Sequence, residues 1–283
     1  MHINELLPIS PGFEKIYNDY VQKGKNFLSK QNICIVGLTR NTSQVIFNTI
    51  NSLVELGESA QNYKIVLFEN DSTDDTVSII NEISKTNNNL HLMSQNYNRI
   101  QFGPVQDQSR TLALAEYRNI LKNHVACNYL NYHFTIVVDT DFQNFSLDGV
   151  YNSFGWLENN ETIGAICGNS FEYKMLPSLE YSLWNYDSWA YRGSWWDNLQ
   201  AHNIAKIAFN PMAWFGLQIL PIGSSPFRVN SAFGGMSIYR NHFFINGNYG
   251  GEDCEHVIFH HDLKSKNPNF NLFLNPSQRM LLQ

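Results

Sequence analysis

The sequence predicts an α/β fold built on a doubly wound, mostly parallel sheet. Three short segments, at residues 33–39, 63–69 and 134–138, are almost continuously apolar, as strands covered on both faces usually are. Segments with apolar residues at helical spacing separate these strands, and this alternation is typical of parallel sheets. No linker rich in Pro, Gly or Ser divides the chain, so we expect a single domain over residues 1–283.

Each expected element has a local signal. The first helix follows Thr42 and Ser43, either of which can cap it, and ends near Gly57. The second helix is expected to be capped near Asp74. Further helices are expected at 110–122, 147–158 and 251–263, and further strands at 90–94, 163–167 and 235–239.

The composition narrows the classes of partner. Lys and Arg total 19 against 25 Asp and Glu, which gives a formal charge of −6. A protein held to nucleic acid by its phosphates normally carries a basic surplus, so we expect no nucleic-acid partner. The four cysteines are far apart and show no C-x-x-C spacing, which disfavours a disulfide framework and a structural zinc site. A reducing compartment fits this pattern.

No segment has the sequence of a secretory signal or a membrane span. The most apolar long stretch, at 207–222, contains two prolines and is shorter than the roughly 20 residues that a spanning helix needs. We therefore expect a cytoplasmic protein without a transmembrane segment. Peripheral contact of this stretch with a membrane surface is the alternative to a buried position.

Two carboxylates, Asp139 and Asp141, come directly after the apolar strand at 134–138. Ligands of such sheets bind beyond the carboxyl ends of the strands, and residues two apart share a face if the strand continues. Hard oxygen donors suit a divalent cation such as Mn2+ or Mg2+, and two like charges are costly to bury without one. The pair predicts a metal site, with a solvated turn as the alternative.

Polar side chains at two other places are expected to contact a nucleotide. Glu69 and Asp71 end the second strand and can accept hydrogen bonds from a base or a ribose. Arg110 and Arg118 are eight residues apart, so they can share a helix face and reach a diphosphate; Asn119 follows them. The alternatives are that the acidic residues only complement the dipole of the helix that follows them, and that the two arginines are solvated. The sequence contains no G-x-G-x-x-G fingerprint and no P-loop, which disfavours dehydrogenases and kinases.

The segment GGEDCEH at 250–256 is expected to open a helix near Gly251. Asp253, His256 and His260 lie at i, i+3 and i+7, so on one helix they would share a face and converge on a site. The H-E-x-x-H pattern of zinc proteases is absent, so a metalloprotease is disfavoured.

The stretch at 181–196, YSLWNYDSWAYRGSWW, combines aromatic rings with polar neighbours. Such groups suit a sugar, which offers C–H faces and hydroxyl edges, although large aromatic side chains also dominate protein cores. From this stretch we expect Tyr186, Asp187, Trp189 and Trp195 to contact an acceptor.

Together these motifs resemble the GT-A class of nucleotide-sugar glycosyltransferases. The resemblance rests on ICIVGLTRN (33–41), ENDSTDDT (69–76), RTLALAEYRN (110–119), the D-x-D at 139–141 and GGEDCEH (250–256), in this order. Within the class, NYDSWAYR (185–192), PFRVNSAFGGMSIYR (226–240) and DCEH (253–256) are similar to the fungal capsule-associated mannosyltransferases and their bacterial and viral relatives.

The resemblance implies a GT-A sheet with a nucleotide-sugar-binding half, residues 31–145, and an acceptor and catalytic half, residues 146–283. It implies GDP-mannose or a UDP-hexose as donor, a carbohydrate or glycosylated acceptor, and Mn2+ or Mg2+ held by Asp139 and Asp141. Many members carry a metal-binding His well beyond the E-D pair, and this chain has none after His261. His256, His260 or water would then complete the shell, and we take His256 as the third ligand. The fungal relatives are also membrane-anchored, which this chain does not show.

The nucleotide-sugar contacts expected in this way are Thr39, Arg40, Glu69, Asp71, Arg110, Arg118, Asn119, Asp139, Thr140 and Gly235. Asp253, positioned by Glu252, is expected to act as the base if the transfer inverts the anomeric centre. If the transfer retains it, Asp253 would steady the oxocarbenium charge. A sugar nucleotidyltransferase and a non-catalytic carbohydrate-binding protein on the same sheet are the alternative functions.

Overall fold

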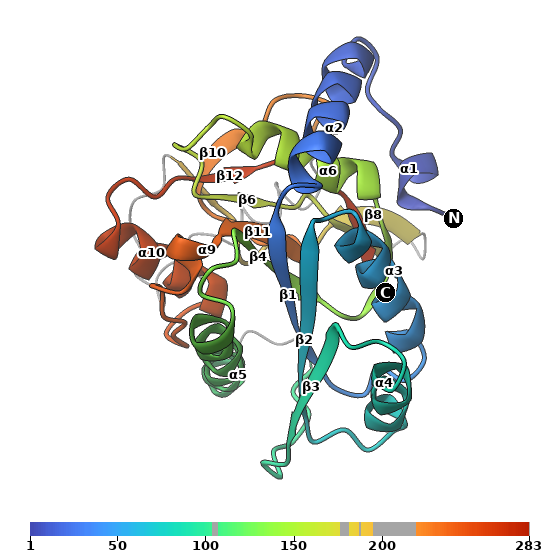
Figure 1. Cartoon of the computed structure of the whole chain (residues 1–283), viewed down its shortest axis with the longest axis vertical. Helices are drawn as coiled ribbons and strands as arrows, with labels where there is room; N and C mark the ends of the chain where they lie inside the picture. The colour runs from blue at the N-terminus through green and yellow to red at the C-terminus, as the bar shows by residue number, and fades with distance from the viewer. Residues whose placement is uncertain (104–106, 176–180, 187, 195–218, 283) are drawn as a thin grey trace.

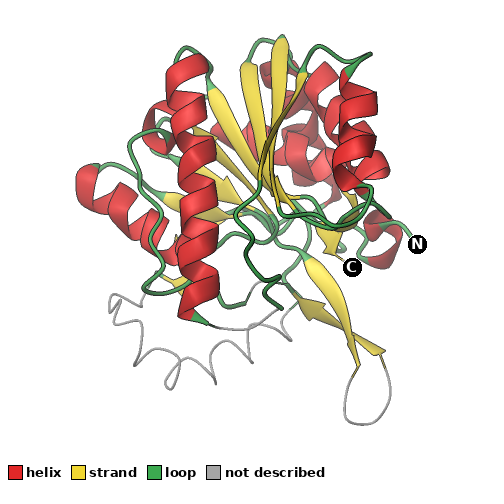
Figure 2. Ribbon diagram, turned by 90° about the horizontal axis from the view of Figure 1, so that it is seen from below, coloured by secondary structure: helices red, strands yellow, loops and turns green. Residues whose placement is uncertain are grey.

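The computed structural model describes residues 1–103, 107–175, 181–186, 188–194 and 219–282. In this part of the chain a large mixed sheet and a smaller sheet form the framework, and helices cover both faces of the large sheet (Figures 1 and 2). The fold is therefore α/β, as the sequence predicts. None of the helices within these ranges is both long and apolar enough to cross a bilayer. Most of the stretch at 207–222 lies outside the described residues.

The large sheet has the strand order β3-β2-β1-β4-β11-β6-β12-β10-β9. Its strands are β1 (Asn32–Thr39), β2 (Asn62–Asn70), β3 (Leu90–Gln95), β4 (Phe134–Asp139), β6 (Ala165–Cys167), β9 (Arg192–Gly193), β10 (Phe227–Ser231), β11 (Met236–Arg240) and β12 (Leu272–Leu274). The first four strands in this order run parallel, whereas β11 pairs antiparallel with both β4 and β6. Because β4 pairs with β11, the two halves of the chain share one sheet.

The helices form a layer on each face of this sheet. One layer contains α1 (Ile3–Leu6), α2 (Glu14–Leu28), α3 (Ile46–Glu58), α4 (Thr76–Ser84) and α6 (Leu147–Leu157), and the other contains α5 (Gln108–Asn128), α9 (Asn241–Phe244) and α10 (Glu255–Lys266). Along β1, Ile33 and Ile35 pack in the first layer, and Cys34 and Val36 pack in the second. This alternation explains why the strand is continuously apolar: both of its faces are buried.

Two helix starts differ from the predictions. Helix α3 begins at Ile46 rather than directly after Thr42 or Ser43, and it has no side-chain cap, because a turn closed on the Thr42 carbonyl precedes it. Helix α10 begins at Glu255 rather than near Gly251, because residues 251–253 form a bend. The expectation that one helix face carries Asp253 is therefore wrong.

Helix α2 precedes the first strand and packs closely against α6. A Cβ atom at Gly24 would lie 1.6 Å from the carbonyl oxygen of Tyr151, and one at Gly155 would lie 2.1 Å from that of Tyr20. Only glycine permits such an approach of two helix backbones. The stacked rings of Tyr20 and Trp156, with centroids 3.6 Å apart, extend this contact.

The smaller sheet has the order β5-β13-β7-β8. Its strands are β5 (Phe142–Phe145), β7 (Phe171–Met175), β8 (Tyr181–Asn185) and β13 (Met280–Leu282). Figure 2 shows the β7–β8 hairpin extending away from the helices. Strand β5 follows β4 after two residues, so this sheet lies directly beside the Asp139 end of the large sheet.

Candidate active site

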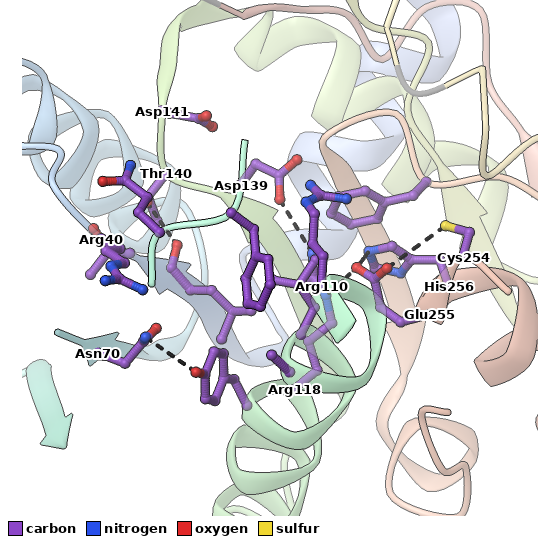
Figure 3. A pocket seen from close by; sticks show the side chains of 18 of the residues that line it. Arg40, Asn70, Arg110, Arg118, Asp139, Thr140, Asp141, Cys254, Glu255 and His256 are labelled. Carbon is purple, nitrogen blue, oxygen red and sulfur yellow. Dashed lines mark hydrogen bonds and ion pairs between the residues drawn. The ribbon is translucent and has the colours of Figure 1, made fainter. Parts of the chain in front are cut away.

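A cavity of about 270 Å³ lies where β1, β2 and β4 end, and Thr39, Asn70 and Asp139 from these strand ends line it. Helix α5 contributes Arg110, Ala113, Leu114, Tyr117 and Arg118 to the lining, at the spacing of a single helix face. Figure 3 shows Cys254, Glu255 and His256 on the opposite side from Arg40 and Asn70, with Arg118 and Asp139 between the two groups.

The structure brings most of the predicted site residues together. Thr39, Arg40, Arg110, Arg118, Asp139, Thr140, Asp141, Tyr186, Trp189 and His256 line the cavity. Glu69, Asp71, Asn119, Gly235, Glu252 and Asp253 do not belong to its lining. Asp187 and Trp195 lie outside the described residues.

Arg118 joins the two halves of the site. Its Nε donates to Glu255 Oε1 at 3.0 Å, and its Nη2 lies 3.4 Å from Asp139 Oδ1. The Tyr186 hydroxyl donates to the other Asp139 oxygen at 3.0 Å. Burial raises the pKa of Asp139 to about 7; the Arg118 cation opposes this rise and the Asp141 carboxylate adds to it. The negative charge on Asp139 is therefore only partly compensated by Arg118.

The backbone around the D-x-D segment fixes the direction of its side chains. Gly235, at φ +71°, accepts a hydrogen bond from the Asp139 amide at 2.8 Å, so it supports Asp139 from β11. Thr140 is buried, and its hydroxyl donates to the Leu38 carbonyl at 2.8 Å. Asp141 is exposed and lines the cavity. Within the described residues, no three Asp, Glu, His or Cys side chains are grouped closely enough to form a metal-ligand cluster.

The nucleotide contacts predicted at the end of β2 lie behind the cavity lining and bond to neighbouring loops. Glu69 accepts from the Ser72 amide at 2.6 Å, and Asp71, which has φ +53°, accepts from the amides of residues 97 and 98, both at 2.7 Å. Arg40 donates to the carbonyls of residues 99 and 100. Partial burial opposes ionisation of Asp71, but hydrogen bonds from Asn70 and this loop lower its pKa. Asp71 and Arg40 thus hold the loop at 97–100, and the next two residues, Gln101 and Phe102, line the cavity.

Asn119 also has a role in the scaffold. Its amide group donates to the Tyr249 carbonyl at 2.9 Å and accepts from the Tyr249 amide at 3.0 Å. This pair of bonds fixes α5 against the segment that leads into α10.

Asp253 is buried and bonded away from the cavity. Its Oδ2 accepts from Arg192 Nη2 at 2.9 Å, and its Oδ1 accepts from the Cys254 amide at 2.7 Å. Arg192 is fully buried and donates to the carbonyl of Trp189 at 2.6 Å, so Asp253 helps to position that ring at the cavity wall. Glu252 is exposed.

The two histidines of α10 have different surroundings. His260 is bonded on both ring nitrogens, to the Ser231 hydroxyl at 2.9 Å and the Tyr239 hydroxyl at 2.7 Å, and burial lowers its pKa to about 3. His256 stacks on Phe233, with ring centroids 3.7 Å apart, and neither of its nitrogens has a hydrogen-bond partner among the described residues. Burial, with the Arg118 cation, holds the pKa of His256 well below its usual range.

Sequence reasoning missed Glu255 as a site residue. A helix that began near Gly251 would have carried Asp253 on the face towards the site, so the sequence predicts Asp253 instead of Glu255. The buried residues Glu255, Phe259 and Leu263 are four apart, which would have placed Glu255 on the inner face of a helix that begins there. Phe233, Tyr117 and Asn70 also line the cavity, and no pattern in the sequence identifies them as site residues.

Comparison with known proteins supports the fold. Residues 34–104, which include β1 to β3, match the model of the family described as glycosyl transferase family 2. No curated protein sequence matches the chain.

Three solved structures resemble the whole described fold at low sequence identity. A mannosyltransferase from Pyrobaculum calidifontis, in complex with GDP-Man and Mn2+, has a TM-score of 0.50 at 13% identity, over 95% of this chain and 65% of its own. Glucosyl-3-phosphoglycerate synthase from Mycobacterium tuberculosis, with Mn2+, UDP and phosphoglyceric acid, has a TM-score of 0.51 at 14% identity, over 98% and 78%. Mannosyl-3-phosphoglycerate synthase from Rubrobacter xylanophilus has a TM-score of 0.50 at 12% identity, over 95% and 70%.

The chain thus spans less than two thirds of the length of the Pyrobaculum enzyme. Its large sheet, flanked by helices on both faces, matches these GT-A neighbours, and its first three strands match glycosyl transferase family 2.

Proposed function

We propose that this chain is a metal-dependent glycosyltransferase that moves a hexose from a nucleotide-sugar donor to a hydroxyl of a carbohydrate or glycosylated acceptor. The main support is that Asp139 and Asp141 line one cavity with Arg40 and Arg110, at the carboxyl ends of parallel strands. Carboxylates for a cation and arginines for a diphosphate are the groups that such a donor requires. The solved relatives with GDP-Man or UDP and Mn2+ support the same class of donor.

Asp139 and Asp141 would hold the cation, Mn2+ or Mg2+. The pKa of about 7 for Asp139 fits this role, because its charge is only partly balanced by Arg118 and a divalent ion would stabilise it. A bound ion would neutralise the diphosphate leaving group. We do not assign His256 as the third ligand, because within the described residues it is not grouped with two other Asp, Glu, His or Cys side chains closely enough to form a metal-ligand cluster.

Asp253 in this proposal is a positioning residue rather than the base. It is bonded to Arg192 and acts on the cavity through Trp189. The similarity of the segments at 185–192 and 226–240 to the capsule-associated mannosyltransferases makes GDP-mannose the first donor to test, followed by the UDP-hexoses.

The test is calorimetric binding of GDP-mannose, UDP-glucose, UDP-galactose and UDP-GlcNAc with and without Mn2+, followed by release of the nucleoside diphosphate on adding acceptors. Wild type is compared with Asp139→Ala/Asp141→Ala and with the control Asp19→Asn/Glu82→Gln, which removes two exposed carboxylates. We expect metal-dependent binding of one donor, lost only in the first variant. A folded wild-type protein that binds none of the donors, or binds them equally without metal, would overturn the proposal.

A further inference from the structure

We propose that the inner end of the cavity, formed by Glu255, His256 and Arg118, binds hydroxyl groups of an uncharged donor sugar and rejects sugars that carry a carboxylate. The inference rests on the proposed function, because it concerns the sugar of the same donor. It assigns to His256 a role in donor specificity.

The first observation is the unusual position of the His256 ring. The residue is 2% exposed and lines the cavity, yet neither ring nitrogen is hydrogen-bonded within the described part of the chain. Glu255 Oε1 lies 3.7 Å from His256 Nε2, which is too long for a hydrogen bond. His260, one turn further along α10, has both nitrogens bonded. Buried polar groups are nearly always paired, and these two nitrogens have no partner among the described residues, so they are suited to bind a ligand in the cavity.

A second buried donor lies at the same end of the cavity. Arg118 is 6% exposed, and two of its nitrogens interact with Glu255 and Asp139. Its third nitrogen, Nη1, has no partner among the described residues. Phe233 contacts both side chains: His256 stacks on its ring, and the Arg118 guanidinium lies 5.2 Å from its centroid.

The charges at this end favour a neutral ligand. Arg118 and Glu255 form an ion pair with no net charge, the charge of Asp139 is the one that the proposed cation would balance, and His256 is uncharged because burial holds its pKa well below its usual range. This end of the cavity therefore has no surplus positive charge to pair with a phosphate or a sugar carboxylate, and burying such an anion beside the Glu255 carboxylate would be unfavourable. The diphosphate is better placed near Arg40 and the metal-binding carboxylates.

The donors and acceptors match a sugar hydroxyl. A neutral imidazole offers one N–H donor and one acceptor, Arg118 Nη1 offers a donor, and the Glu255 carboxylate accepts. Each hydroxyl of a hexose can donate and accept, so two neighbouring hydroxyls would pair with the His256 and Arg118 nitrogens that have no hydrogen-bond partner among the described residues. Sites of this kind discriminate strongly, because an unsuitable ligand leaves the buried polar groups without partners.

The first experiment compares His256→Phe with wild type by calorimetry in the presence of Mn2+. The phenyl ring keeps the stack on Phe233 and removes both nitrogens. For the donor that binds wild type, we expect the Kd to rise about tenfold, as for the loss of one or two hydrogen bonds, while the Kd of its nucleoside diphosphate changes less than twofold. His256→Gln, which keeps a donor and an acceptor, should restore part of the loss.

The second experiment tests selection by charge. Wild type and Glu255→Gln are titrated with UDP-glucose and UDP-glucuronic acid, and with GDP-mannose and GDP-mannuronic acid. We expect wild type to bind the neutral member of the preferred pair at least tenfold more tightly. The preference should shrink in Glu255→Gln, because the buried carboxylate that repels the uronate is then neutral.

These results separate the inference from the proposed function. If wild type binds no nucleotide sugar, the proposed function fails. If wild type binds a donor and His256→Phe binds it equally well, or wild type binds the uronate as tightly as the hexose, only the present inference is overturned. If His256→Phe loses the dependence of nucleoside diphosphate binding on Mn2+, His256 is a metal ligand and the inference is also overturned.

Discussion

Arg118 lies between two carboxylates from distant parts of the chain, and its positive charge compensates the negative charge of both. With Arg118 removed, Asp139 and Glu255 would be left side by side and largely buried, with 18% and 5% of their side chains exposed. We expect Arg118→Met to lower the free energy of unfolding by about 3–5 kcal/mol, as for other broken buried ion pairs. Arg110→Met, on the same helix face but less buried, should change it by about 0.5 kcal/mol or less. Urea unfolding followed by circular dichroism measures both; equal losses would contradict the central role of Arg118.

The two histidines of α10 predict opposite effects of the same substitution. His260→Phe breaks two buried hydrogen bonds and should cost about 1–3 kcal/mol. His256→Phe breaks none, so the protein should keep its stability or gain some. Thermal unfolding of the ligand-free protein is the measurement. A similar loss in both variants would show that the His256 nitrogens are bonded within the folded chain.

At the scale of elements, Asp74 links the starts of α3 and α4. Its carboxylate accepts from the Ser43 amide and the Thr76 amide, each at 3.0 Å, and these bonds lower its pKa to about 2 against the opposing effect of partial burial. From the sequence we expect only that the helix is capped near Asp74, and the link to α3 is not predicted. We expect Asp74→Ala to destabilise by about 1 kcal/mol, and the control Asp75→Ala, which makes no cap hydrogen bond, to have little effect. Since the pKa is lowered, the contribution of Asp74 should be complete above pH 4 and disappear as the pH falls through 2; guanidinium chloride unfolding at several pH values tests this.

Elements with a strong local pattern could be predicted from the sequence, and those fixed by distant contacts could not. The strands at 33–39, 63–69 and 134–138 are predicted within one residue at each end, because burial on both faces leaves a continuous apolar run. Helix α2 is not predicted, although its buried residues Tyr17, Val21, Gly24 and Leu28 lie at helical spacing. Strands β10, β12 and β13 are short and take their pairing from residues far away in the chain.

In the candidate site, too, the residues with a local sequence pattern could be predicted, and those placed by distant contacts could not. Residues that end predicted strands, such as Thr39 and Asp139, line the cavity as the sequence analysis expects. Glu255 and Asp253 are only two residues apart, and which of them faces the cavity depends on where α10 begins. That boundary is set by the bend at 251–253 and by the bond from Asp253 to Arg192, neither of which has a local signature.

For the molecule as a whole, the buried histidines should make stability depend on pH. The pKa of His256 is held well below its ordinary value of 6.5, so the unfolded chain binds a proton near pH 6 that the folded protein does not. The part of the free energy of unfolding that depends on an uncharged His256 is complete at higher pH and is lost as the pH falls through 6.5. Asp139 has a raised pKa in the folded protein, so its ionisation changes the free energy of unfolding in the opposite direction. The comparison of wild type with His256→Phe isolates the histidine. Between pH 7.5 and 5.5 wild type should lose about 1.4 kcal/mol relative to the variant, measured by chemical unfolding; parallel pH profiles would show that His256 is protonated in the folded state.

The position of β13 has a consequence for synthesis on the ribosome. Strands β5 and β7 are not neighbours in the small sheet; β13, made long after both, lies between them. During translation, the edges of β5 and β7 therefore remain unpaired on the side that β13 will occupy, while the parallel strands β1 to β4 already have their partners. The nascent chain can therefore complete the sheet beside Asp139 only when residues 280–282 have left the exit tunnel.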